Sequence, residues 1–427
     1  MLPRFVVSDS GQIDVNPQGV DDETLTLPGF INVHSHAFQR VLRGRVERRP
    51  QGREKGSFWT WREAMYRAAN ALTVGDVRTL ATWAYRDMVR AGFVAVGEFH
   101  YLHDAPSMDR ALAMSRALVD AARDAGIHLC LLETAYETSS FHTPALPEQR
   151  RFVFSGDTGF LDFHREAARE LGAREGISMG LALHSVRACP ARLIEAVADE
   201  AKRTNVPLHI HACEQRKEVE DCFAVHGMSP VAWLDQHGAL GPSTTLIHAT
   251  HLDDADIALI AERGAGVCLT PSTERNLGDG LARIGDMHRA GIALSIGTDS
   301  HARIDPLDEL RALDEQERLR VEERNPLAKP GQRLAEVLMP IGTVNGRRAL
   351  GMKAHEPGVV GMRIPLEGRA GNAADGLDAL LIAGTQRDID FVMGVEGRVL
   401  KNMRQHGSDD AQLEAEVIAI LRTLGQT

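Results

Sequence analysis

Two histidines separated by a single residue, His34 and His36, lie in the apolar run GFINVHSH near the start of the chain. If this run is a strand, its period of two places both imidazoles on the same face. Neutral imidazoles are ligands for zinc and similar divalent ions. On its own such a pair is more often two core or surface histidines. A metal site therefore requires further ligands elsewhere in the sequence.

Further histidines and one aspartate lie near the ends of other short apolar runs. They are His184, His209, His211, His248, His251 and Asp299. If these runs are the strands of a barrel, their ends form the rim where barrel enzymes place catalytic groups. Several imidazoles with one carboxylate and an open position are typical of a catalytic centre for Zn²⁺ or a related ion. Their recurrence at strand ends favours such a centre over structural histidines.

The spacing within the runs separates candidate ligands from their neighbours. In HIHACE, His211 lies closer to the strand end than His209 and stands three residues before Glu214. We predict that His211 faces the metal and that His209 is a core or supporting residue, since such residues orient metal ligands. By the same reasoning His248 is preferred over His251 in HATH. The fourth run contains no lysine that could be carboxylated to bridge two ions, which favours one divalent ion per chain.

Eight short apolar runs alternate with longer amphipathic segments, and this alternation predicts the elements that position the candidate ligands. The runs span residues 29–36, 93–102, 128–136, 178–186, 207–214, 244–252, 264–271 and 292–300. Intervening segments such as VGDVRTLATWAYRDMVRAG carry apolar residues at helical spacing and end at glycine. Eight strands with intervening helices indicate an α/β protein, a (β/α)₈ TIM barrel over residues 29–352.

The two flanks of the chain differ from this pattern. Residues 1–28 hold one weak strand, and residues 355–402, including LDALLIAG at 377–384, are expected to form short strands broken by turn residues. We therefore expect a small β-rich appendage formed by both termini, residues 1–28 and 353–427. The segment DDAQLEAEVIAILRTLG begins with acidic residues and carries an apolar stripe, which predicts a C-terminal helix. A long aromatic and basic insertion after the first run is a candidate substrate lid.

The composition disfavours several classes of protein. With 48 Lys+Arg against 59 Asp+Glu the net charge is −11, and 43% of the residues are hydrophobic. This suits a soluble globular protein and argues against nucleic-acid or anionic-membrane partners. The 5 cysteines are scattered without a CxxC pair, so neither a disulfide framework nor a thiolate zinc site is predicted. With no secretory signal pattern and no apolar window long enough to span a membrane, we expect a cytoplasmic protein.

Several longer motifs resemble a known superfamily. PGFINVHSHAFQR, HIHACE, LIHATHL and GTDSHARIDPLDELR are together similar to the amidohydrolase superfamily, in its branch of mononuclear metal-dependent deaminases. HSHAFQR, SFWTWREAMYR, GEFHYLHD, LALHSVRA, CEQRKEVEDC and PSTERNLGDG further resemble one family in that branch, the N-formimidoyl-L-glutamate deiminases of histidine degradation. The likeness covers residues 28–350, and the chain departs from the pattern at both ends.

The resemblance implies a division of labour among the candidate residues. The metal ligands would be His34, His36, His211 and Asp299. Zinc is the default ion for such ligands. Glu214 and His248 would handle the formimino group and water, with Glu214 moving a proton to the departing nitrogen. Asp299 would accept a proton from the attacking water.

A substrate with two carboxylates requires cationic contacts. Arg187 and His184 are candidates where the fourth run exits into its loop, since a guanidinium can bind a carboxylate through two hydrogen bonds. Without the resemblance, an arginine there is more often a solvated loop charge. The resemblance further implies substrate contacts from Gln39, Tyr101 and, on the aromatic insertion, Arg62.

The expected reaction converts N-formimidoyl-L-glutamate and water to N-formyl-L-glutamate and ammonia. One alternative is a purine or pyrimidine deaminase of the same superfamily, but a neutral base needs no clamp for carboxylates. Another is a catalytically inactive barrel that serves as a scaffold, and such a protein has no need to retain the whole set of ligands. Family likeness suggests a homodimer that binds a small dicarboxylate, with no nucleic-acid or membrane partner.

Overall fold

Eight parallel strands form one sheet in the order β13-β12-β11-β10-β9-β6-β5-β4. The computed structural model describes residues 6–7, 13–14, 24–48, 58–105, 107–154, 159–352, 358–369, 373–394, 399–401 and 408–425. The strands are β4 (Phe30–Ser35), β5 (Phe93–His100), β6 (His128–Ala135), β9 (Ile177–Ser185), β10 (Leu208–Ala212), β11 (Thr244–His248), β12 (Gly266–Leu269) and β13 (Ala293–Ile296). Each falls on one of the predicted apolar runs, so the predicted (β/α)₈ barrel is confirmed.

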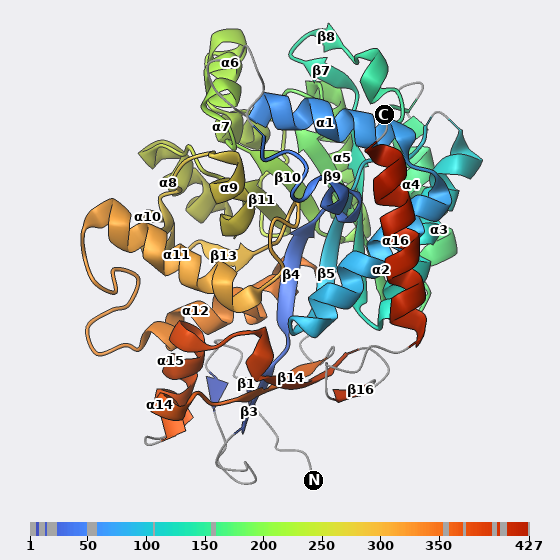
Figure 1. Cartoon of the computed structure of the whole chain (residues 1–427). Coiled ribbons are helices and arrows are strands. Elements are labelled where there is room, and N and C mark those ends of the chain that lie inside the picture. Colours follow the sequence, from blue (N-terminus) through green and yellow to red (C-terminus); the bar gives the residue numbers. More distant parts are fainter. Residues whose placement is uncertain are drawn as a thin grey trace.

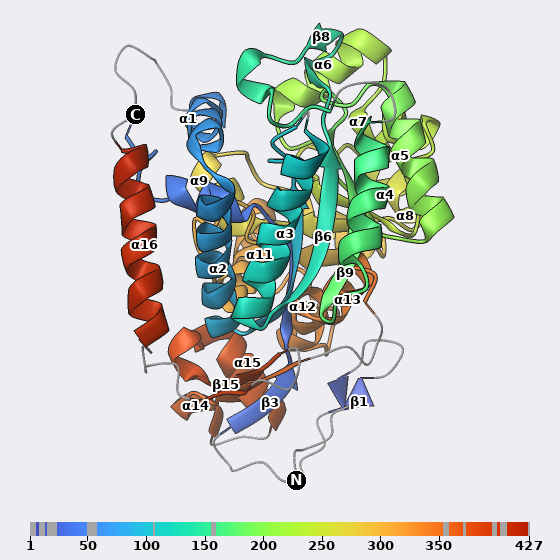
Figure 2. The same cartoon turned by 90° about the vertical axis from the view of Figure 1, so that its right-hand side faces the viewer.

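Helices surround the barrel and connect its strands (Figures 1 and 2). They are α1 (Phe58–Ala71), α2 (Val74–Arg90), α3 (Met108–Ala125), α4 (Gly159–Leu171), α5 (Ala191–Thr204), α6 (Arg216–His226), α7 (Pro230–Gln236), α8 (Asp254–Arg263), α9 (Pro271–Leu277), α10 (Ile284–Arg289), α11 (Pro306–Val321), α12 (Leu334–Gly342) and α13 (Val344–Ala349). A capping box between Thr73 and Asp76 begins α2, and Gly126 in the left-handed region ends α3. The predicted stop at glycine is therefore a real helix boundary in α3.

A second sheet is built from both ends of the chain. Its antiparallel order is β16-β15-β14-β3, with β3 at Thr24–Pro28, β14 at Val359–Arg363, β15 at Ile389–Met393 and β16 at Val399–Lys401. Strands β1 (Val6–Val7) and β2 (Ile13–Asp14) form a separate pair. In both views the appendage lies at the amino ends of the barrel strands, whereas α1 lies at their carboxyl ends (Figures 1 and 2). The predicted appendage from both termini is confirmed.

One predicted strand in this appendage is wrong. Residues 377–384 were expected to be extended, but α15 covers Ala373–Ala383. Leu377, Leu380 and Leu381 are all buried, and their spacing of three and four residues places them on one helical face. The short helices α14 (Leu366–Arg369) and η3 (Gln386–Asp388) flank it. A short apolar run of this kind fits either a strand or a helix, and packing against the barrel favours the helix.

The predicted C-terminal helix is present as α16 (Ser408–Leu424). Asp410 near its start forms ion pairs with Arg86 and Arg90 of α2 at 3.1 and 2.8 Å. Of the insertion after the first strand, residues 49–57 lie outside the described residues, and the following part forms α1. Among the described helices, none has the length and apolar character needed to cross a bilayer.

The barrel closes where β4 meets the segment after β13. The main-chain N–H groups of Thr298 and Asp299 donate to the carbonyl of His34 at 3.1 and 2.9 Å, and the N–H of His36 donates to the carbonyl of Asp299 at 3.0 Å. A Cβ at Gly297 would lie 2.8 Å from the Cβ of His34. Only glycine permits this close approach of the two backbones.

A buried side chain reinforces the same seam. The amide of Asn32 donates to Thr298 Oγ1 at 2.7 Å and accepts from the N–H of Thr298 at 3.0 Å. Asn32 is fully buried. The side chain therefore adds two hydrogen bonds to the main-chain pairing at this seam.

We predict that Asn32→Leu lowers the free energy of unfolding by about 1–3 kcal/mol, because it removes two hydrogen bonds between Asn32 and Thr298 from a fully buried position. Urea denaturation followed by circular dichroism measures this loss. The exposed substitution Gln412→Leu on α16 serves as the control and should change stability by less than about 0.5 kcal/mol. An Asn32→Leu protein as stable as the wild type would show that the seam does not depend on this side chain.

Candidate active site

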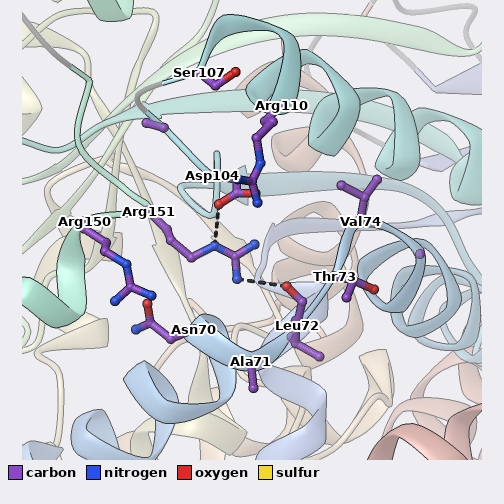
Figure 3. Close-up of a pocket in the computed structure, with 12 residues that line it drawn as sticks. Asn70, Ala71, Leu72, Thr73, Val74, Asp104, Ser107, Arg110, Arg150 and Arg151 are labelled. Carbon is purple, nitrogen blue, oxygen red and sulfur yellow. Dashed lines mark hydrogen bonds and ion pairs between the residues drawn. The ribbon is translucent and has the colours of Figure 1, made fainter.

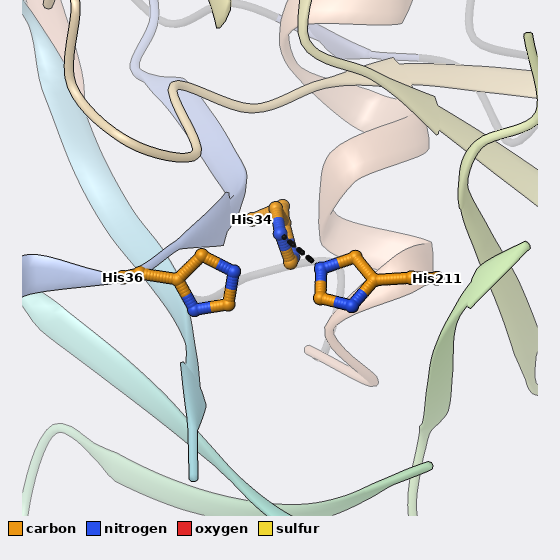
Figure 4. Close-up of side chains that lie close together, drawn as sticks. All are labelled: His34, His36 and His211. Atoms are coloured by element: carbon orange, nitrogen blue, oxygen red, sulfur yellow. Dashed lines mark hydrogen bonds between the residues drawn. The ribbon is translucent and has the colours of Figure 1, made fainter. Parts of the chain in front are cut away.

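Three histidines and one aspartate predicted as metal ligands converge at the carboxyl ends of the barrel strands. His34 lies on β4, His36 directly follows it, and His211 lies on β10 (Figure 4). Nε2 of His34 is 3.1 Å from Nε2 of His211. Asp299 Oδ1 lies 3.5 Å from His34 Nε2 and 3.4 Å from His36 Nε2. The structure thus brings together four residues from three distant parts of the sequence.

Hydrogen bonds fix which nitrogen of each ring faces the centre. The Nδ1 atoms of His36 and His211 lie 2.9 Å from the carbonyls of Phe99 and His184. A carbonyl only accepts, so each Nδ1 carries the hydrogen and each Nε2 presents a lone pair. Burial first, and then neighbouring imidazoles, lower the pKa of His34 and His211. Neutral imidazoles with converging lone pairs beside a carboxylate fit a divalent cation.

His248 lies at the end of β11 among three carboxylates. Its Nε2 is 3.9 Å from Glu214 Oε1 and 3.9 Å from Asp299 Oδ2, and its Nδ1 is 3.4 Å from Glu274 Oε1. Burial alone would lower the pKa of His248. The charge of Glu214, the hydrogen bond with Glu274 and the charge of Asp299 outweigh burial and raise this pKa to about 10. Burial raises the pKa of Glu214. The surrounding carboxylates thus favour the protonated form of His248, beside a carboxyl group at Glu214 whose pKa burial raises.

The backbone at these strand ends adopts an unusual conformation. Cys213, His248 and Asp299 have φ angles of 54°, 70° and 48°, in the left-handed region that residues other than glycine seldom occupy. Such residues cost about 1–3 kcal/mol each and cluster at functional sites. The turns allow Glu214, His248 and Asp299 to face one another immediately beyond their strands.

The residues predicted to bind substrate line one cavity above the centre. Its wall includes all five of them, Gln39, Arg62, Tyr101, His184 and Arg187. The same cavity is lined by the candidate site residues His36, His211, Glu214, His248 and Asp299. Gln39 Nε2 donates to the hydroxyl of Tyr101 at 2.7 Å. The cavity thus places two guanidinium groups within reach of a ligand at the candidate centre.

His209 and His251, predicted to be structural, point elsewhere. His209 Nε2 lies 2.8 Å from the carbonyl of Ala349, and His251 Nε2 lies 2.9 Å from the carbonyl of Asp279. Neither lines the cavity. Both rings therefore have hydrogen-bond partners away from the centre.

Sequence reasoning gave no role to two acidic residues that support the site. Glu274 accepts from the N–H of Thr270 at 2.9 Å as well as facing His248. Glu98 accepts from Ser35 Oγ at 2.6 Å and from the N–H of Ala37 at 2.7 Å, and so holds the loop around His36. Both lie in motifs that the sequence singled out, PSTERNLGDG and GEFHYLHD. The available signal was an acidic residue just beyond a predicted strand for Glu274, and an acidic residue within an apolar run for Glu98.

A second buried cluster contains His100, His103 and Glu133, whose ligand atoms lie within 4.8 Å of one another. His103 Nε2 is 2.9 Å from the carbonyl of Thr134, so its Nδ1, 3.4 Å from Glu133 Oε2, accepts hydrogen bonds. Burial raises the pKa of Glu133 to about 8. A protonated Glu133 facing a neutral His103 forms a compatible pair without a cation.

Another hollow lies at the turn between α1 and α2, beside the start of α3 (Figure 3). Its wall contains Arg151, which donates to Asp104 Oδ1 at 2.8 Å and to the carbonyl of Leu72 at 2.9 Å. Arg110 binds the second oxygen of Asp104 at 2.5 Å. None of the predicted site residues lines this hollow. These arginines join the loops rather than contribute to the centre.

Comparisons with known proteins agree with this geometry. The model of the amidohydrolase family matches residues 25–358. The chain is 37% identical to the formimidoylglutamate deiminase of Pseudomonas aeruginosa, over 97% of this chain and 94% of that protein. It is 27% identical to a 5-methylthioadenosine/S-adenosylhomocysteine deaminase of Haloarcula marismortui, over 71% of this chain and 65% of that protein.

Solved structures show the same architecture. An amidohydrolase from Brucella melitensis superposes with a TM-score of 0.85 at 32% identity, covering 97% of this chain and 93% of its own. A zinc-bound adenosine deaminase from Xanthomonas campestris superposes with a TM-score of 0.78 at 21% identity, covering 95% and 87%, and supports the fold alone. A barrel with histidines and aspartate at its strand ends, matched by the family model over most of its length, shows that this chain belongs to the amidohydrolase family.

Proposed function

We propose that this protein hydrolyses N-formimidoyl-L-glutamate to N-formyl-L-glutamate and ammonia. The observation that carries the proposal is the shared cavity, in which Arg62 and Arg187 line the same wall as Glu214 and His248. A dicarboxylate needs cations, whereas a neutral purine or pyrimidine does not. The P. aeruginosa relative, 37% identical over nearly its whole length, carries the name of this activity.

His34, His36, His211 and Asp299 would hold one divalent ion in this centre. Zn²⁺ is the default for nitrogen and oxygen ligands, although Fe²⁺ and Mn²⁺ accept the same set. When bound, the ion lowers the pKa of water toward neutrality and polarises the substrate. The buried Nε2 atoms of His34 and His211, which lie 3.1 Å apart, support this assignment.

Glu214, His248 and Asp299 supply the proton transfers. Water adds to the imino carbon, and Asp299 accepts a proton from it. His248, held as a cation between Glu214, Glu274 and Asp299, hydrogen-bonds the attacking oxygen and stabilises the tetrahedral carbon. Glu214 delivers two protons to the terminal nitrogen, the one that Asp299 took from water and the one that the added hydroxyl releases as the C–N bond breaks, so that ammonia leaves. The remaining carbon becomes the formyl group.

The arginines and the Gln39–Tyr101 pair would hold the glutamate part. Arg187 is 8% exposed, so a carboxylate bound to it is largely removed from water, where charge-assisted hydrogen bonds are strong. Arg62 extends from α1, which lies across the carboxyl end of the barrel (Figure 1). We further propose a cytoplasmic location, supported by five free and buried cysteines. A homodimer is expected from the resemblance, and light scattering tests it.

Ammonia release tests the proposed function most directly. The purified protein is assayed side by side with N-formimidoyl-L-glutamate, adenine, guanine and cytosine. We expect turnover of the formimidoyl substrate only. Faster release from a base would support the alternative deaminase, and no release from any of the four compounds would support an inactive scaffold.

Removal of the metal should abolish turnover without unfolding the protein, because a chain of this length buries a large core without an ion. The measurement is ammonia release and far-ultraviolet circular dichroism after dialysis against a chelator. Addition of Zn²⁺ should restore activity. Loss of helical signal together with activity would instead assign the metal a structural role.

Glu214→Gln should retain metal and substrate binding but lose about 10²–10⁴-fold in kcat, because the amide preserves the shape of the side chain and cannot transfer a proton. Glu220→Gln, an exposed change on the adjacent helix α6, is the matched control and should leave kcat unchanged. Turnover near the wild-type rate would remove Glu214 from the mechanism.

Arg187→Met should lower kcat/KM roughly ten- to several-hundredfold, because hydrogen bonds to charged groups contribute about 1.5–3 kcal/mol each. Lysine should restore only part of the loss, since it lacks the planar fork. An analogue with the corresponding carboxylate converted to an amide should be a poor substrate for the wild type and almost indifferent to the substitution. Equal losses on both substrates would mean that Arg187 supports the fold instead.

A further inference from the structure

A group of polar side chains at the cavity wall has no role in the mechanism above. Tyr66 of α1 and Tyr136, which directly follows β6, line the cavity together with Arg62 and Arg187. Behind the two phenols lies Gln149, which is fully buried. Gln149 ends the short helix η2 (Pro147–Gln149), part of an excursion between β6 and α4 that also contains β7 (Thr138–Ser140) and β8 (Thr143–Pro144).

The orientation of the Gln149 amide is determined by its partners. Oε1 accepts from the N–H of Leu146 at 2.8 Å, and a main-chain N–H can only donate. The amide nitrogen therefore faces the two phenols, donating to Tyr66 Oη at 2.8 Å and to Tyr136 Oη at 2.6 Å. Both amide hydrogens are used, and each phenol oxygen acts as an acceptor. Each phenol retains its own hydrogen. Tyr66 and Tyr136 share one of these in a hydrogen bond with each other, so one phenol hydrogen remains for a ligand.

The two tyrosines connect this amide to the arginines. The guanidinium of Arg62 lies 5.6 Å from the centre of the Tyr66 ring, an attractive arrangement of a cation over an aromatic face. The ring of Phe152 packs against both phenols, with centroids 6.0 Å from Tyr66 and 5.6 Å from Tyr136. Burial first, and then Tyr66, raise the pKa of Tyr136 well above its ordinary value, although Arg187 lowers it. The hydroxyl of Tyr136 is therefore protonated and able to donate.

We propose that Tyr136 is a specificity-determining residue that donates a hydrogen bond to the substrate carboxylate bound by Arg187, and that Gln149 is the positioning residue that holds Tyr136 and Tyr66 in place. Tyr66 in turn supports Arg62. The inference rests on the proposed function, because it assigns the hydroxyl to one carboxylate of the same substrate. If Gln149 positions Tyr136 in this way, the excursion before α4, rather than a barrel strand, contributes to the choice of substrate.

Two substitutions test the inference without altering the proposed catalytic residues. Tyr136→Phe removes only the hydroxyl, and Gln149→Met removes both donors at similar length. Each should raise KM for N-formimidoyl-L-glutamate roughly tenfold while kcat changes by less than about twofold, since the contact is made equally in the ground and transition states. Calorimetric affinity of the holoenzyme for N-formyl-L-glutamate should fall by the same factor. Glu148→Gln, the exposed neighbour of Gln149, should change neither value.

Two amide analogues identify which of the two substrate carboxylates Tyr136 contacts. N-formyl-L-glutamine and N-formyl-L-isoglutamine each lack one carboxylate, and for one of them Tyr136→Phe should cause no loss of affinity. Equal losses for both analogues, or unchanged KM and affinity in Tyr136→Phe, overturn the inference. A fall in kcat matching the rise in KM also overturns it. If the wild type binds N-formyl-L-glutamate but releases no ammonia from the formimidoyl compound, the proposed function fails, and the calorimetric comparison still decides the role of Tyr136.

Discussion

The position of the candidate centre depends on how the barrel closes. The hydrogen bonds that join β4 to the segment after β13 are made by the main chains of His34, His36 and Asp299, whose side chains converge on one another. A slip of one residue along this seam would turn each side chain to the opposite face. Closing the sheet in the correct register and assembling the ligands are therefore the same event, and Asn32 and Gly297 act on both.

The centre also concentrates polar groups that a protein interior does not readily accept. His34 and His211 stay neutral because burial disfavours their charged forms. Three carboxylates surround His248 and raise its pKa, which favours its charged form. Electrostatic interactions with these neighbouring groups are stronger in a medium of low dielectric constant than in water. Packing of the surrounding barrel holds these polar groups in place. The same packing stabilises the left-handed backbone conformation at Cys213 and Asp299.

Much of the architecture was readable from the sequence because barrel strands are short, apolar and separated by amphipathic helices. The histidines and Asp299 stood at the strand ends, so their convergence followed once a barrel was assumed. The sequence did not predict helix α15, because an apolar run of eight residues is too short to distinguish the period of a helix from that of a strand. Gln149 was missed because nothing local marks it. Its contacts are with Tyr66 and with Tyr136, and only the folded excursion brings these three together.

The excursion between β6 and α4 has a consequence for how related enzymes diverge. Barrel closure fixes the candidate metal ligands at set positions on the strands. Substitutions at these positions therefore affect both the centre and the closing of the barrel. Gln149 supports the cavity wall, through Tyr66 and Tyr136, from a connection that contributes no strand to the barrel. Insertions or exchanges within this connection can reshape the ligand pocket while the closing strands keep their register. The fold thereby separates a part that evolution must conserve from a part in which new substrate preferences can arise.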